Sequence, residues 1–195
     1  KAVLYRANLA GTDLSNANLR ETNLRGANFK GSILLGVNLS RSIYDKFTVW
    51  PEGFDPEKSG AYFLGPNENL SGKDLSKFNL SNLNLSKANL SGVDLSNCTL
   101  NGIELTDADL SGVNLKNAQL YNSCLRNTNL SLANLFDVNL SNVNLEDANL
   151  LGSFYNRTTV WPKGFDFQVS GSIGPQAKLA GKDLSGWNLT KVNVQ

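Results

Sequence analysis

Leucine recurs at every fifth position through the middle of the chain, from Leu70 to Leu150, seventeen times in unbroken succession. The residue before the leucine is Asn or Asp in thirteen of these seventeen units, and the residue two before it is small or aliphatic in most. The segment Ala88-Asn89-Leu90-Ser91-Gly92 is typical. A helix places apolar residues three and four apart and a strand alternates them, so a strict period of five fits neither element. The pattern instead indicates a repeat array.

Each five-residue unit has two inward side chains separated by an outward one, which predicts a very short extended segment followed by a polar corner. Four such sides form a square coil of twenty residues, and the coils are expected to stack at the inter-strand spacing of about 4.8 Å. Residues twenty apart then share a column. The inner columns are Val93, Val113 and Ala133; Phe78, Cys98, Ala118 and Val138; Leu83, Ile103, Ser123 and Val143; and Ala88, Ala108, Thr128 and Ala148.

The two cysteines occupy different positions in this register. Cys98 falls on an inward column, whereas Cys124 takes the outward position normally held by Asn or Asp. Two cysteines are too few for a disulfide framework and lack the spacing of a zinc site. We therefore expect both to be free thiols.

The repeat resembles that of the pentapeptide-repeat family, in which Leu or Phe at the centre and a small residue two before it point into the core. The resemblance implies an all-β fold, a right-handed quadrilateral β-helix of about seven coils. The same register fits both ends of the chain, at Leu4, Leu9, Leu14, Leu19, Leu24, Phe29, Leu34 and Leu39, and at Leu179, Leu184, Leu189 and Val194.

Two similar segments interrupt the period, TVWPEGFD at 48–55 and TVWPKGFD at 159–166. We interpret 1–44, 70–155 and 179–195 as repeat blocks of one continuous solenoid, and 45–69 and 156–178 as loop excursions that leave the coil. Trp50 and Trp161, with Phe54 and Phe165, are expected to pack against the flank of the solenoid. The alternative is an aromatic recognition loop. The Trp-Pro-x-Gly-Phe-Asp element is similar to segments of cyanobacterial pentapeptide-repeat proteins.

Composition disfavours several classes of function. Eighteen basic and seventeen acidic residues give a net charge of +1, with no global attraction to nucleic acid. Residues 1–44 carry +4 and residues 70–155 carry −3. Some family members bind DNA gyrase by resembling duplex DNA, but that role needs an anionic surface. The net charge therefore argues against this alternative.

The sequence offers no arrangement for catalysis, a metal or a cofactor. Histidine is absent, and so are the phosphate-binding loop and the dinucleotide fingerprint. We expect a protein that is not an enzyme and uses no cofactor. The alternative is a catalytic domain with a pocket at the Trp-Pro segments.

Apolar residues at outward positions are the candidate interaction surface, and the expected partner is a protein of unknown identity. These are Tyr121, Leu132, Phe136 and Leu151, together with Trp50 and Trp161. Exposed apolar clusters can mark interfaces.

The expected role is a structural scaffold or protein-interaction module. The chain starts in repeat register without Met, so we interpret it as part of a longer cyanobacterial protein. Similar proteins include regulators of heterocyst differentiation and a membrane-anchored protein needed for heterocyst glycolipid deposition. No run in this chain is long and apolar enough to cross a bilayer, so any anchor is expected elsewhere, and the compartment is not indicated.

Overall fold

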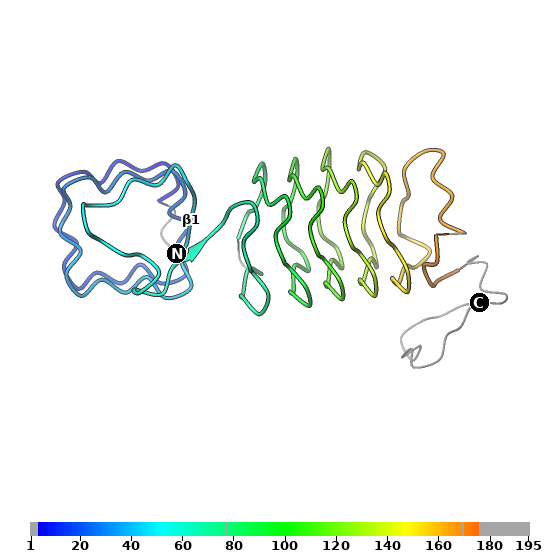
Figure 1. The fold of residues 1–195 in the computed structure, drawn as a ribbon, viewed down its shortest axis with the longest axis horizontal. Helices are drawn as coiled ribbons and strands as arrows, with labels where there is room; N and C mark the ends of the chain where they lie inside the picture. The colour runs from blue at the N-terminus through cyan, green and yellow to red at the C-terminus, as the bar shows by residue number, and fades with distance from the viewer. Residues whose placement is uncertain (1–3, 77, 169, 176–195) are drawn as a thin grey trace. The chain divides into compact units, whose positions relative to one another are not determined.

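The computed structural model describes residues 4–76, 78–168 and 170–175. The chain divides into two compact units, unit 1 (Lys1–Gly65) and unit 2 (Pro66–Gln195). In Figure 1 the coils of unit 1, coloured blue to cyan, have a square outline, and those of unit 2, green to yellow, follow one another as a stack. Each unit is therefore a solenoid.

Backbone hydrogen bonds between successive coils hold each unit together. Asn89 pairs with Asp109, twenty residues later, and the same parallel spacing recurs along unit 2. The Leu90 N–H donates to the Asp109 carbonyl at 2.7 Å, and the Asp109 N–H donates to the Ala88 carbonyl at 2.9 Å. The predicted twenty-residue coil is confirmed. Each side contributes only one paired residue, so the only regular strands among the described residues are the two-residue β1 (Ile43–Tyr44) and β2 (Tyr62–Phe63).

Each corner is a turn fixed by the residue before the central leucine. Asn89 Oδ1 accepts the Ser91 N–H at 2.9 Å, and the Val93 N–H closes the turn on the Leu90 carbonyl at 3.1 Å. Gly92 has a φ of 67°. A positive φ at this turn position favours Gly or Asn. The Asn-Leu-Ser-Gly sequence therefore encodes the corner as well as the core.

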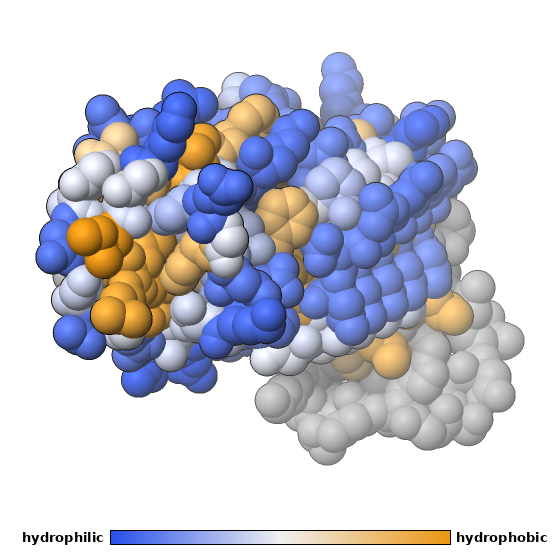
Figure 2. All heavy atoms as spheres, turned by 60° about the vertical axis from the view of Figure 1, so that its left-hand side comes forward, coloured by the Kyte–Doolittle hydropathy of each residue, from blue (hydrophilic) through white to orange (hydrophobic). Residues whose placement is uncertain are grey.

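Four columns of paired residues define four faces of unit 2. We name them A (Asn89, Asp109, Asn129 and Asn149), B (Asp94, Asn114 and Asn134), C (Asn79, Thr99, Gln119 and Asn139) and D (Asn84, Glu104, Cys124 and Asn144), and name each corner by the two faces that it joins. Figure 2 shows the resulting rows of hydrophilic residues along the coils.

Faces A and B carry ladders of side-chain amides. On face A, Asn149 Nδ2 donates to Asn129 Oδ1 at 3.1 Å, and Asn129 Nδ2 donates to Asp109 Oδ1 at 3.0 Å. On face B, Asn134 bonds Asn114 at 3.1 Å, and Asn114 bonds Asp94 at 3.0 Å. Amide ladders of this kind reinforce stacked strands. The outward Asn residues are thus part of the architecture.

The core of unit 2 follows the sequence register. All seventeen leucines from Leu70 to Leu150 are buried. The inward columns are buried too, apart from Ala148, which is partly exposed. Two inward hydroxyls are accommodated because each has a carbonyl to bond: Ser123 Oγ donates to Leu100 O and Thr128 Oγ1 donates to Leu105 O, both at 2.9 Å. A buried polar group is tolerated when it is hydrogen-bonded.

The first interruption does not leave the coil, so the prediction of a loop excursion over 45–69 is wrong. Val49 pairs with Asn28, and its N–H donates to the Ala27 carbonyl at 2.9 Å. This spacing is twenty-one residues, and the pairing of β1 with β2, which joins Ile43 to Tyr62, has a spacing of nineteen. One extra residue at the first corner is therefore followed by two fewer residues later in the same coil.

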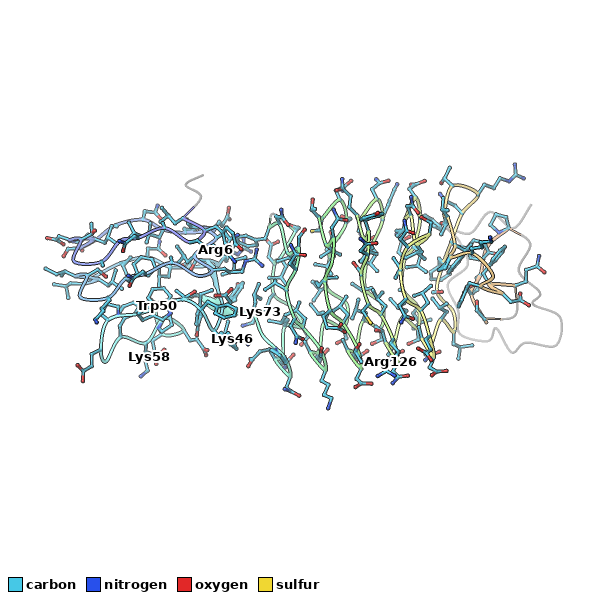
Figure 3. The ribbon with its side chains drawn as sticks, turned by 90° about the horizontal axis from the view of Figure 1, so that it is seen from above. Arg6, Lys46, Trp50, Lys58, Lys73 and Arg126 are labelled. Carbon is cyan, nitrogen blue, oxygen red and sulfur yellow. The ribbon has the colours of Figure 1, made fainter. Side chains whose placement is uncertain are left out.

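The predicted flank packing of Trp50 is also wrong, because the indole forms the next layer of the core. Trp50 is stacked on Phe29, with ring centroids 4.8 Å apart and an interplanar angle of 3°. Tyr44 contacts it edge-on and Phe54 lies at 5.4 Å. Figure 3 shows Trp50 among the coils of unit 1, whereas the Lys58 side chain points outward. We call this layer an aromatic end coil.

The second interruption has the same construction. Val160 pairs with Asn139 and Ile173 with Phe154, which again gives spacings of twenty-one and nineteen residues. Trp161 is stacked on Phe167 at 5.5 Å and 4°. Over residues 156–168 and 170–175, the segment predicted as the excursion 156–178 therefore also forms an aromatic coil, and we use the name aromatic end coil for it because it is the last coil that the structure describes. The predicted third repeat block, 179–195, lies outside the described residues.

Both cysteines are free, as predicted. Cys98 is buried and Cys124 is partly exposed. Burial, with a smaller contribution from the charges of Asp94 and Asp74, raises the pKa of the Cys98 thiol from 9.0 to about 11. The Cys98 thiol is therefore neutral in the folded state at physiological pH.

Replacing Leu110, which is fully buried between two coils of unit 2, should show how strongly the stack depends on each leucine. We expect Leu110→Ala to lower the free energy of unfolding by about 2 to 5 kcal/mol, because it leaves a cavity in a close-packed core. Urea denaturation followed by circular dichroism measures this. The exposed Lys116→Ala should change stability by no more than about 0.5 kcal/mol, and equal losses in both variants would contradict the model of the core.

Trp50 tests the aromatic end coil. Among the described residues, its buried Nε1 has no hydrogen-bond partner. Trp50→Phe should therefore cost about 1 kcal/mol or less, because it keeps the stack on Phe29 and removes an unpaired donor. Trp50→Ala should cost about 3 to 5 kcal/mol. If thermal unfolding showed equal losses for both variants, stacking would not be the dominant contribution of this residue.

The two thiols should react differently with a thiol reagent. At pH 8 we expect one equivalent, from Cys124, to react in the folded protein and the second, from Cys98, only after unfolding. Because the folded-state pKa of Cys98 is raised, its contribution to stability is complete below pH 9 and falls as the pH rises toward about 11. Cys98→Ala should lack this dependence. Rapid reaction of two equivalents in the folded state would refute the burial of Cys98.

Candidate functional site

The structure places the predicted surface residues in different environments. Tyr121, Leu132 and Leu151 are exposed, at 60%, 51% and 49%. Phe136 is only partly exposed. Trp50 and Trp161 belong to the aromatic end coils described above. Three of the six side chains are therefore prominent apolar features of the surface.

Only two of the six residues are neighbours. Leu132 and Leu151 lie on the same corner, AB, in adjacent coils, and the Leu132 N–H donates to the Leu151 carbonyl at 3.0 Å. Phe136 follows on corner BC and Tyr121 lies on corner CD. Trp161 lies in the end coil of unit 2, and Trp50 belongs to unit 1. The six residues do not form one surface, but Leu132 and Leu151 form an apolar pair on corner AB.

Leu132 has the positive φ of its corner position, but its side chain is unusual for that position, which is otherwise held by glycine or by polar and charged residues in the described part of the chain. Its φ is 59°, and it is the only aliphatic residue with a positive φ in the described part of the chain. The equivalent residues one coil before and after it are Gly112 and Gly152, which also have positive φ. The left-handed conformation costs about 1 to 2 kcal/mol for a residue with a Cβ. The backbone at corner AB is thus strained at an exposed leucine.

A hollow of about 860 Å³ lies beside Trp161 in the end coil of unit 2. Its lining includes Tyr155, Arg157, Trp161 and Phe165, and the described residues contribute no carboxylate, thiol or imidazole to it. Burial raises the pKa of Tyr155 to about 12, and its hydroxyl donates to the Pro175 carbonyl. The one potential nucleophile in the lining, Thr159, donates to the Leu135 carbonyl at 2.8 Å. This lining suits an apolar contact better than acid–base chemistry.

Several exposed apolar residues were not singled out from the sequence. In unit 1, Leu35 is 76% exposed and Ile33 also lies at the surface. Both belong to the unit Ser32-Ile33-Leu34-Leu35-Gly36, in which Leu34 is the buried centre. The outward position of Ile33 and the corner position of Leu35 could have been found by applying the five-residue register to the first block. The remaining ones are Tyr5, Phe47, Val49 and Val160.

A search of the described residues for metal or membrane features finds none. There is no group of three His, Cys, Asp or Glu residues that could hold a metal ion. Nor does the described part of the chain contain a helix of the length and hydropathy needed to span a bilayer.

The family model for pentapeptide repeats matches this chain, with eight copies of the repeat. The matched segments are 2–43, 69–102, 88–127 and 114–152. Together they cover well over half of the chain. A search of curated proteins finds no match.

Solved structures of pentapeptide repeat proteins resemble the chain at low identity. One from Nostoc is 30% identical over 54% of this chain and 83% of its own, with a TM-score of 0.37. One from the Arabidopsis thaliana thylakoid lumen is 26% identical over 47% and 67%, with a TM-score of 0.38. HetL, described as involved in heterocyst differentiation regulation in Nostoc, is 27% identical over 78% and 63%, with a TM-score of 0.23.

These TM-scores are low, and the family assignment rests on the repeat match together with the twenty-residue coil. The leucine core, the Asn-capped corners and the square outline of the coils all agree with it. The chain therefore belongs to the pentapeptide repeat family, whose fold is a right-handed quadrilateral β-helix.

Proposed function

We propose that this chain is a non-enzymatic scaffold that binds a protein partner through Leu132 and Leu151 on corner AB of unit 2. The observation that carries the proposal is the exposed aliphatic side chain of Leu132 at a position of positive φ, where the coils on either side have glycine. A strained backbone at an exposed site supports a hypothesis of function, because folding gains nothing from it.

Leucine at position 132 contributes little to the folded state. Its side chain is about half exposed, and glycine occupies the same column in the coils on either side. Glycine adopts a positive φ without a steric penalty. A leucine that costs stability here is understandable if the side chain buries itself in a partner.

Leu151 supports the same proposal. Its side chain lies over Gly171, where an added Cβ would be 3.1 Å from Leu151 Cδ1. Leu151 is therefore held against the next coil, and it remains about half exposed beside Leu132. Two adjacent leucines within polar rows form a small apolar patch, and exposed apolar patches mark interaction sites.

The absence of an enzymatic role is part of the proposal. The lining of the hollow beside Trp161 supports it, because its hydroxyl groups already donate to backbone carbonyls and it offers no stronger acid or base. General acid–base catalysis requires a group that titrates near the working pH.

We further propose that the chain is the repeat domain of a larger cyanobacterial protein in cell differentiation or envelope glycolipid deposition. The support is the resemblance of TVWPEGFD and TVWPKGFD to segments of cyanobacterial proteins. Sequencing the complete gene tests the membrane-linked version of this proposal, which requires several hydrophobic helices in the same protein and would fail for a short chain without them.

Substitution of Leu132 separates stability from binding. Leu132→Gly should raise the free energy of unfolding by about 1 kcal/mol, because it relieves the strained φ. The same variant, and Leu151→Ser, should lose the partner that the native chain retains in a quantitative pull-down.

Two controls define this experiment. Gly112→Leu introduces a leucine at the equivalent position of the preceding coil, so it should destabilise the fold by about 1 to 2 kcal/mol. Tyr121→Ser removes an exposed apolar side chain from corner CD and should leave the partner bound. Retention of the same partner by Leu132→Gly and Leu151→Ser would refute the proposed surface.

A further inference from the structure

Face C of unit 2 differs from faces A and B at Gln119 and Asn139, whose side-chain amides do not form a ladder. In the described structure, the side chains of Gln119 and Asn139 form no hydrogen bond with each other, although they occupy adjacent coils of face C. The Asn139 Oδ1 caps the Ser141 N–H at 3.0 Å, whereas the Gln119 side chain has no hydrogen bond among the described residues. Face C therefore presents amide groups that the fold leaves available.

The corner after Gln119 explains why this amide is free. In a regular unit the residue before the leucine caps the corner, as Asn129 does for the Ser131 N–H at 3.2 Å. Here the corresponding donor is the Tyr121 N–H, and it bonds Asn101 Oδ1 of the preceding coil at 2.9 Å. Asn101 therefore caps the Tyr121 N–H in place of Gln119, and the longer Gln119 side chain does not bond this corner.

A shallow hollow of about 350 Å³ lies over face C, between its two corners. Gln119 and Asn139 form its floor, with Asn101 and the exposed Tyr121 on corner CD and Asn117 and Asp137 on corner BC. Because adjacent coils are about 4.8 Å apart, Gln119 and Asn139 place two polar groups at that spacing on the floor of the hollow. The volume is near the lower end of the range for small-molecule sites.

Asp137 adds a charged acceptor at the rim. Its Oδ1 accepts bonds from Asn156 Nδ2 at 2.9 Å and Thr158 Oγ1 at 2.5 Å. These two bonds, that from Thr158 first, hold the pKa of the carboxyl below its usual value, so it is ionised at neutral pH. No described residue bonds Oδ2. This oxygen can accept a hydrogen bond from a ligand hydroxyl.

We propose that the hollow on face C, with Tyr121, Gln119, Asn139 and Asp137, binds a neutral carbohydrate. A sugar ring has an apolar face and a rim of hydroxyl groups that both donate and accept hydrogen bonds. Tyr121 supplies an exposed aromatic surface with a polar end, the amides supply donors and acceptors, and Asp137 supplies an acceptor. The negative charge of Asp137 disfavours anionic sugars.

The test is isothermal titration of the full chain with cellohexaose, maltohexaose, mannohexaose and chitohexaose. We expect saturable binding of at least one of these oligosaccharides. Tyr121→Ala and Gln119→Ala should each weaken it by about tenfold or more, which corresponds to about 1.4 kcal/mol. Neither side chain forms a hydrogen bond within the described structure, so both variants should fold, and circular dichroism verifies this.

Phe47→Ala is the matched control, because it removes an exposed aromatic ring from unit 1 and should leave the affinity unchanged. The proposal is overturned if none of the four oligosaccharides binds saturably, or if either Tyr121→Ala or Gln119→Ala binds with unchanged affinity. The result is independent of the protein-binding proposal, because Leu132 and Leu151 lie on corner AB and the three substitutions leave that corner intact.

Discussion

The hydrogen bond between the leucine N–H and a carbonyl of the following coil constrains the rest of this molecule. It repeats only if four sides of five residues return the chain to the same place, so each corner must use the same number of residues. The Asn or Asp before the leucine caps that corner, and most often a glycine or asparagine adopts the positive φ that follows. Because every side has five residues, the inward leucine recurs at every fifth position and the outward amides line up in rows along the coils.

The sequence predicted the regular part of the fold because one residue of each unit decides its side of the coil. It failed at the two interruptions, where Trp50 and Trp161 were assigned to loops. A backbone pair such as Asn28 with Val49 forms without a leucine beside it. One extra residue in the corner also shifts the following residues out of the five-residue period, so the pattern of the sequence no longer reveals the coil. The stacking of Trp50 on Phe29 also joins residues twenty-one apart, outside the twenty-residue columns.

For the candidate surface, the sequence predicted the outward positions but not the backbone strain or the free amide. Tyr121, Leu132 and Leu151 were correctly assigned to the outside, and counting in steps of twenty would have placed the two leucines on one corner. The positive φ of Leu132 follows from its column of glycines, but its strain becomes evident only in the backbone. The free amide of Gln119 depends on Asn101 capping a corner of the next coil, which is a contact between coils that no pattern in one repeat encodes.

The aromatic end coils bear on a hazard shared by all stacked β structures. A terminal coil presents unpaired N–H and carbonyl groups, and such edges invite another molecule to pair with them. A regular coil would offer a second solenoid a matching set at twenty-residue intervals. The end coil of unit 1 departs from that regularity, because its spacings to the preceding coil are twenty-one and then nineteen residues. A coil with this spacing therefore does not repeat the hydrogen-bonding pattern on which the regular stack is built.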